Sequence, residues 1–279
     1  MIGTFSISAI IFGADGVVHT GQANRDQRRA ASGARGYLAG RYQPLLAAAA
    51  AAIVFSLFSA LAPTSLDNYV LLADAWLHGH LWVAHLPGPW IDAMPYHGRY
   101  YIIEAPAPAI LLLPFVAIFG TSTNQTVLGV ALAAISAFGV WRLSEYLGLS
   151  RWLSVLLVAF LSFGTSLGFC AAYGAVWFVA HLSAVAFTML ALAEIYGSER
   201  GWVVSLWAVL AALSRYPLIL ALPVYAVLLY LRTRSTSVLF GYCALLIPAV
   251  VAYAAYNYAR WGMKLARFRG ELLIGHYAA

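Results

Sequence analysis

The feature that most constrains this chain is the length of its uncharged stretches. No Asp, Glu, Lys or Arg occurs from Trp152 to Ala193. Because a helix needs about 20 mainly apolar residues to cross a bilayer, this stretch predicts two consecutive spans with a turn near residues 164–174. Comparable runs recur along the chain, so the sequence predicts a polytopic membrane protein of the all-α class rather than a singly anchored one.

Composition supports the same class. Hydrophobic residues make up 63% of the 279-residue chain and charged residues only 9%, whereas a soluble globular domain is about 25% charged. The net charge of +6 is best explained by arginines that flank helices. The basic residues are scattered, so we expect membrane lipids as surroundings and no nucleic-acid partner.

The chain divides into three expected parts. Residues 1–42 contain five arginines among Gly, Ala and Gln and predict a disordered cytoplasmic arm. Residues 43–259 form a transmembrane module of seven or eight spans, and 260–279 form a short tail. We expect helices at 44–62, 107–120, 126–141 and 238–255, two spans within 152–193, and either two short helices or one broken helix over 202–231.

The polar loop at 63–106 is expected on the extracytoplasmic side. The stretch from Ser65 to Phe115 holds four acids and four of the seven histidines. Apolar residues recur at helical spacing over 67–83, and the tryptophans suit the headgroup layer. We therefore predict one or two helices lying on the membrane surface, followed by a short extended piece at 100–103.

Asp67 is the first candidate catalytic residue. A carboxylate at the membrane surface is suited to remove a proton from an acceptor hydroxyl, and partial burial would raise its pKa. The alternative is that Asp67 only caps the following helix, as aspartates commonly do. Residue type alone leaves both interpretations open.

Further polar residues are candidates for substrate binding. Glu104 precedes a proline-rich helix start, and Asp92 and Arg99 lie in the same loop; pairing of Glu104 with Arg99 as an ordinary surface ion pair is the alternative. His181 and Arg215 fall within apolar segments, where polar groups face an interior or a watery cavity. Arg215 is suited to bind a lipid-linked phosphate, unless it marks a true loop.

No cofactor is expected. The histidines at 78, 80, 85 and 97 lack the spacing of a zinc motif. A divalent cation held by carboxylates and water stays open, but interfacial histidines without a metal are the simpler explanation.

Six stretches resemble one known family in their order and spacing. They run 67–79, 92–101, 105–115, 174–181, 213–217 and 256–262, and include Asp67–Val70, Ala105–Phe115, Leu213–Pro217 and the Tyr-Asn-x-x-Arg pattern of Tyr256–Arg260. Together the stretches resemble the bacterial branch of the GT-C-type integral membrane glycosyltransferases, the dolichyl-phosphate-mannose-protein mannosyltransferase-like group. The resemblance covers roughly residues 60–270.

The resemblance implies a hexosyl- or pentosyltransferase of the bacterial inner membrane, with its active face extracytoplasmic. Its donor would be a polyprenyl-phosphate-linked sugar, its acceptor a glycan, lipid or protein, and its reaction would invert the sugar carbon. Asp67 would be the general base, while Arg215 and Arg260 would neutralise the departing phosphate. The expected substrate-binding residues are Asp92, Arg99, Tyr101, Glu104, His181, Arg215, Asn257 and Arg260.

Two departures from the family pattern leave alternatives. Many members carry a second acid beside the position of Asp67, where this chain has Asn68, and members are usually longer. The chain would then correspond to the N-terminal part of such an enzyme. The alternatives are a non-catalytic protein that binds or transports a polyprenyl lipid, or an inactive fragment of a glycosyltransferase.

Overall fold

The computed structural model describes residues 42–261. The expected basic arm, apart from Tyr42, and the expected tail beyond Trp261 therefore lie outside the described residues. The chain divides into two units, 1–43 and 44–279. The helices and strands belong to the second unit, except that α3 begins with Gln43, the last residue of the first.

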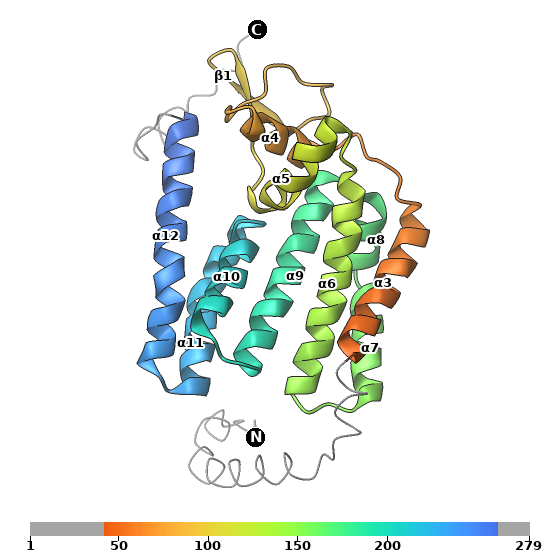
Figure 1. Ribbon diagram of the computed structural model, residues 1–279, viewed down its shortest axis with the longest axis vertical. Coiled ribbons are helices and arrows are strands. Elements are labelled where there is room, and N and C mark those ends of the chain that lie inside the picture. Colours follow the sequence, from red (N-terminus) through yellow and green to blue (C-terminus); the bar gives the residue numbers. More distant parts are fainter. Residues whose placement is uncertain (1–41, 262–279) are drawn as a thin grey trace, which may run out of the picture. The chain divides into compact units, whose positions relative to one another are not determined.

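The described residues form ten α-helices, short 3₁₀ segments and one two-stranded hairpin, which confirms the all-α class (Figure 1). The elements in chain order are α3 (Gln43–Ser59), α4 (Asn68–Leu77), β1 (Ala93–Tyr96), β2 (Arg99–Ile102), α5 (Ala107–Phe119), η2 (Gly120–Ser122), α6 (Gln125–Tyr146), α7 (Arg151–Phe163), α8 (Leu167–Tyr173), α9 (Val176–Tyr196), α10 (Gly201–Ala212), η3 (Tyr216–Ala221), α11 (Leu222–Thr233) and α12 (Thr236–Trp261).

Several helices are long and apolar enough to span a membrane. Four segments meet this description, namely α6, α9, η3 with α11, and α12, and α7 with α8 forms a fifth if this pair, bent by 51°, is one span. Helices α3, α5 and α10 are apolar but shorter. The chain is thus compatible with an integral membrane protein, while the count of seven or eight crossings stays a prediction.

The uncharged stretch divides where the sequence predicts a turn. Helix α7 ends at Phe163, and α8 ends at Tyr173, followed by the C-cap Gly174, whose φ of +56° is left-handed. Such a backbone conformation suits glycine because it lacks a Cβ. Helix α9 then begins at Val176, so the same stretch supplies the bent pair and one full-length span.

Helix α9 is central to the bundle. It lies between α6 and α10, and α12 packs beside α10 (Figure 1). Gly139 on α6 allows close approach, since a Cβ there would lie 2.8 Å from the Cβ of Met189 on α9. Helix α12 is much less buried than α6 and α9. Only 6% of its most apolar 18-residue window is buried inside the protein, against 56% for each of the other two.

Helices α4 and α5 and the hairpin gather at one end of α6 and α9 (Figure 1). Strands β1 and β2 pair antiparallel, with Ala93 opposite Ile102, so the predicted extended piece is present at Arg99–Ile102. Helix α4 is shorter than the expected surface helix, and both Asn68 and Tyr69 are fully buried. It packs against α5, so its apolar residues meet protein on more than one side.

Gln125 joins three segments at this end of the bundle. Its buried Nε2 donates to the carbonyl oxygens of Leu66, at 3.2 Å, and Gly174, at 2.9 Å. Its Oε1 accepts from the backbone N–H of Tyr69 at 3.2 Å. These backbone N–H and C=O groups have no partner in a regular helix or sheet, so the Gln125 amide satisfies their hydrogen bonds. The start of α4 is thereby fixed relative to α6 and to the α8–α9 turn.

Substitution of Gly174 by alanine is expected to destabilise the protein more than the same change at Gly79. Both glycines have positive φ, but a Cβ at Gly174 would overlap Thr126, whereas nothing lies within 4 Å at Gly79. Left-handed backbone costs alanine about 1–2 kcal/mol at either site, and overpacking adds about 1–3 kcal/mol at Gly174. Thermal unfolding in detergent measures both, and equal losses in the two variants would contradict this packing.

Candidate functional site

A cavity of about 300 Å³ lies where four segments meet. The segments are α4, the loop that runs from the hairpin into α5, the start of α9, and the linker between α10 and η3. Its lining residues are Tyr69, Asp92, Ile103, Glu104, Ala105, Trp177, Ala180, Ser214, Arg215, Tyr216 and Pro217.

Backbone hydrogen bonds hold these distant segments together. The N–H of Ala107, at the start of α5, donates to the carbonyl oxygen of Leu213 at 2.9 Å. The N–H of Val176, at the start of α9, donates to the carbonyl oxygen of Leu66 at 3.0 Å. Residues far apart in sequence, such as Glu104 and Arg215, therefore border one space.

Glu104 is the central acid of the cavity. Its Oε1 accepts a hydrogen bond from Asn68 Nδ2 at 2.7 Å, while its Oε2 is buried without a hydrogen-bond partner among the described residues. The pKa of Glu104 is raised to about 7, mainly by burial and also by the negative charge of Asp92, against the opposing effects of a backbone hydrogen bond, Asn68 and Arg260. The group therefore titrates near neutral pH.

Arg215 supplies positive charge to the same cavity. It follows the end of α10 in an extended conformation, with φ −145° and ψ 112°. Its guanidinium forms no ion pair with any acid in residues 42–261. An arginine that borders a cavity and is not paired with a protein carboxylate is suited to bind an anionic ligand.

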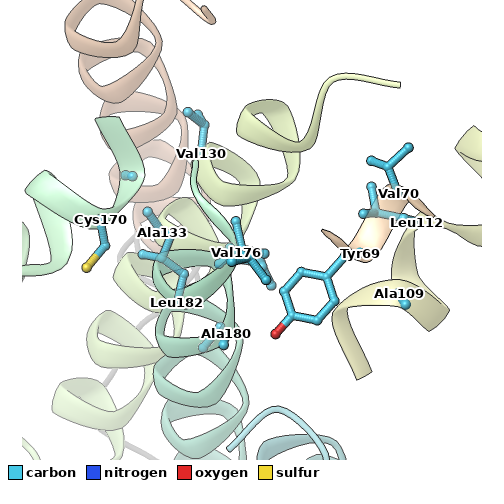
Figure 2. Close-up of a cluster of buried hydrophobic side chains, with 14 of the residues drawn as sticks. Tyr69, Val70, Ala109, Leu112, Val130, Ala133, Cys170, Val176, Ala180 and Leu182 are labelled. Atoms are coloured by element: carbon cyan, nitrogen blue, oxygen red, sulfur yellow. The ribbon is translucent and has the colours of Figure 1, made fainter. Parts of the chain in front are cut away.

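Tyr69 reaches the cavity from α4. Figure 2 shows its ring directed away from α4, with the hydroxyl beside Ala180 of α9. The hydroxyl is buried and has no hydrogen-bond partner in the described part of the chain. Burial and the nearby Glu104 raise the pKa of Tyr69, while Arg215 opposes this. A neutral phenol facing the cavity is available to donate to a ligand.

Asp92 is the second acid at the cavity. Trp177 Nε1 donates to Asp92 Oδ2 at 2.8 Å, and Asn68 Nδ2 approaches the Asp92 backbone oxygen at 3.4 Å. The structure thus brings together three of the predicted residues, Asp92, Glu104 and Arg215.

Asp67 is not among the residues that line this cavity. It occupies the N-cap position of α4, but its side chain makes no capping hydrogen bond. Burial raises its pKa from the ordinary value of 3.8. The alternative that the Asp67 side chain caps the helix is therefore wrong, while the assignment of Asp67 as general base stays a prediction.

The remaining predicted residues lie elsewhere. His181 is exposed on α9, next to the lining residue Ala180. The guanidinium carbon of Arg99 lies 4.4 Å from the centre of the Trp82 ring. The alternative ion pair between Arg99 and Glu104 does not occur within residues 42–261. Asn257 Nδ2 donates to the backbone carbonyl oxygen of Tyr253, one turn earlier in α12, at 3.0 Å.

Tyr101 and Arg260 meet at the end of α12. Both are buried, with 5% and 4% of their surfaces exposed. The Arg260 guanidinium carbon lies 5.9 Å from the centre of the Tyr101 ring. Neither residue lines the cavity that holds Glu104.

One apolar cavity adjoins the polar one, and a second, larger apolar cavity adjoins the first. The larger, about 500 Å³, lies between the α4–α5 region and α12, and the smaller, about 150 Å³, lies between α10, η3, α11 and α12. They share Leu213, Ala249 and Tyr253, and the smaller one shares Tyr216 with the polar cavity. Apolar space thus extends from the polar cavity along α12.

No group of three or more His, Cys, Asp and Glu residues that could hold a metal ion occurs within residues 42–261. His78 pairs with Asp74 one helical turn earlier, at 3.6 Å.

Sequence reasoning missed the roles of Asn68, Tyr69 and Trp177. In the sequence Asn68 is only a departure from a paired-acid pattern, yet its side chain is fully buried and donates a hydrogen bond to Glu104. The available signal was the position of an amide and a phenol directly after Asp67, at the start of a short helix. It identifies polar groups but cannot say which of them face the interior.

Comparisons of this chain with protein-family models, curated protein sequences and solved structures found no significant match.

The raised pKa of Glu104 predicts a specific pH dependence of stability. Its ordinary value is 4.5 and its folded value about 7, so between these values the folded protein binds more protons than the unfolded one. The stability contributed by the neutral carboxyl is full below pH 4.5 and is lost as pH rises through 7.

The melting temperature of the wild type, relative to Glu104→Gln, should therefore fall between about pH 5 and about pH 8. Thermal unfolding in detergent measures both proteins, and Glu145→Gln, an acid in a surface ion pair with Arg142, is the control. A pH-independent difference between wild type and Glu104→Gln would show that Glu104 is not protonated near neutral pH.

Proposed function

We propose that this chain is a membrane glycosyltransferase that moves a sugar from a polyprenyl-phosphate-linked donor to an extracytoplasmic acceptor with inversion. The acceptor is a glycan, a lipid or a protein, and the membrane is the bacterial inner membrane. The proposal combines the family resemblance of the sequence with the chemistry of the polar cavity.

One observation carries the proposal: the unpartnered Glu104 Oε2 and the Arg215 guanidinium border the same cavity. Transfer from a phosphate-linked sugar needs a base for the acceptor hydroxyl and a cation for the departing phosphate. A carboxyl that titrates near 7 matches the pKa expected of an efficient general base at neutral pH. This supports Glu104 as base beside, or instead of, the predicted Asp67.

In the proposed reaction the carboxylate takes the proton of the acceptor hydroxyl. The acceptor oxygen forms a bond to the anomeric carbon from one face, and the bond from that carbon to the phosphate oxygen breaks on the opposite face. The electron pair leaves with the phosphate, whose charge Arg215 stabilises. Tyr69 is placed to donate to a sugar or phosphate oxygen, and Asp92 is placed to accept from a sugar hydroxyl.

The adjoining apolar cavities support a lipid-linked donor. They are lined mainly by aliphatic and aromatic side chains and reach the polar cavity at Tyr216. A polyprenyl chain needs apolar surroundings of this kind, while its phosphate needs the cation.

Glu104→Gln is expected to lower sugar transfer about 100-fold or more, because general-base catalysis contributes roughly 10²–10⁴-fold. The assay uses purified protein in vesicles with a radiolabelled polyprenyl-phosphate sugar and measures product at neutral pH. Asp67→Asn, tested in parallel, should retain more activity than Glu104→Gln.

Glu145→Gln is the control for loss of an acid outside the cavity. A full loss of transfer in Asp67→Asn with activity retained in Glu104→Gln would assign the base to Asp67. Unchanged activity in both variants would refute the carboxylate mechanism altogether.

A second candidate is a protein that binds or transports a polyprenyl lipid without chemistry. The observation that favours it is the apolar cavity of about 500 Å³ beside α12, which is larger than the polar one. The same phosphate would then bind at Arg215, and the carboxyl of Glu104 would only accept a hydrogen bond from the head group.

Arg215→Gln is expected to weaken binding of polyprenyl phosphate about 10-fold or more, because a charge-assisted hydrogen bond is worth about 1.5–3 kcal/mol. Binding to detergent-solubilised protein is measured by fluorescence titration, with Arg142→Gln as control. Binding loss with no transfer by the wild type would support the second candidate, and unchanged binding would exclude Arg215 as the phosphate ligand in either.

A further inference from the structure

The end of α12 forms a buried cluster of aromatic rings around Arg260. Only 4% of Arg260 is exposed. Its guanidinium carbon lies 4.9 Å from the ring centre of Tyr256, 5.1 Å from that of Trp261 and 5.9 Å from that of Tyr101. Aromatic faces attract cations, and they replace part of the water that burial removes.

Arg260 also binds the backbone that leads to the polar cavity. Its Nη2 donates to the carbonyl oxygen of Ile102, the last residue of β2, two residues before Glu104. Trp261 reinforces this contact, because its ring packs against Tyr101 at 4.9 Å and its carbonyl oxygen accepts from Tyr96 at 3.4 Å. The end of α12 is thereby attached to both strands of the hairpin.

Within residues 42–261, the charge of Arg260 has no counterion at contact distance. No acid lies within 4.0 Å of it in the described residues, and its Nε has no hydrogen-bond partner there. Burial of an ionised group without a partner is costly. Its positive charge does act on Glu104, whose ionised form it favours.

We propose that Arg260 is a positioning residue for Glu104: buried among aromatic rings, it holds the Ile102 end of the hairpin, two residues before Glu104, through its hydrogen bond. Arg260 would thus support the acid of the cavity without itself lining the cavity. The inference rests on the proposed function only for the catalytic role of Glu104, because the electrostatic link concerns the folded protein alone.

Several other groups act on Glu104 from the elements packed around it. Asn68 from α4 donates to it, Asp92 from the loop after α4 repels its negative charge, and Arg215 from the α10–η3 linker borders the same cavity. Tyr69 from α4 also faces the cavity, and α9 contributes Trp177, with His181 exposed beside Ala180. A test must therefore change Arg260 alone and read the Glu104 carboxyl directly.

The test is a pH titration of the Glu104 carboxyl by infrared difference spectroscopy on the full chain in detergent. The band of Glu104 is assigned as the one lost in Glu104→Gln. The wild-type midpoint is expected at about 7. Arg260→Gln is expected to raise it by about one pH unit, because removal of a nearby positive charge disfavours the carboxylate. The acidic limb of the transfer rate should shift to higher pH by the same amount.

Arg260→Lys keeps the charge and is the informative variant if Arg260→Gln does not fold. Its midpoint is expected to stay within about half a unit of wild type. Arg142→Gln removes an arginine near the C-terminal end of α6. This change should leave the midpoint unchanged. Thermal unfolding identifies the folded variants.

An unchanged midpoint in folded Arg260→Gln would overturn the proposal. A rise of a full unit in folded Arg260→Lys would also overturn it, because the charge is still present. Since the titration needs no substrate, a wild type that transfers no sugar would refute the proposed transferase while leaving this test intact.

Discussion

The hydrogen bond from Asn68 to Glu104 is the contact on which the polar cavity depends. Both groups lie where α4 packs into the end of the helical bundle, and Asn68 is fully buried. In such surroundings an unpaired polar group costs free energy, so each one either finds a partner or faces a space that a ligand can fill. Glu104 does both, because one carboxyl oxygen is bonded and the other is not.

The same constraint explains how the elements around the cavity are held. Gln125 satisfies backbone groups of three segments, and Arg260 attaches α12 to the hairpin. Polar side chains take on this work because the loops between membrane helices have no regular ladder to pair their backbone. At the polar cavity, the Glu104 Oε2 and the Tyr69 hydroxyl are among the buried atoms without a hydrogen-bond partner in the described residues.

Charge within the cavity is arranged around an acid that titrates near neutral pH. Burial disfavours the carboxylate of Glu104 and Asp92 adds to this effect, while Asn68 and Arg260 oppose it. Arg215 borders the space on another side without a carboxylate partner among residues 42–261. A polar ligand with negative charge and hydroxyl groups would complement both, and the neighbouring apolar space would suit a hydrocarbon chain.

The sequence by itself determined the class of protein, the division of the uncharged stretch near Gly174, and the loop that carries four of the ten acids, because apolar run length and turn residues are local properties. Only the tertiary structure decided which acid borders a cavity. It placed Glu104 beside Arg215, put Asp67 outside the lining, and buried Arg260 among aromatic rings. Such choices depend on how α4, α9 and α12 pack, and packing depends on contacts between residues more than a hundred positions apart, which no local pattern encodes.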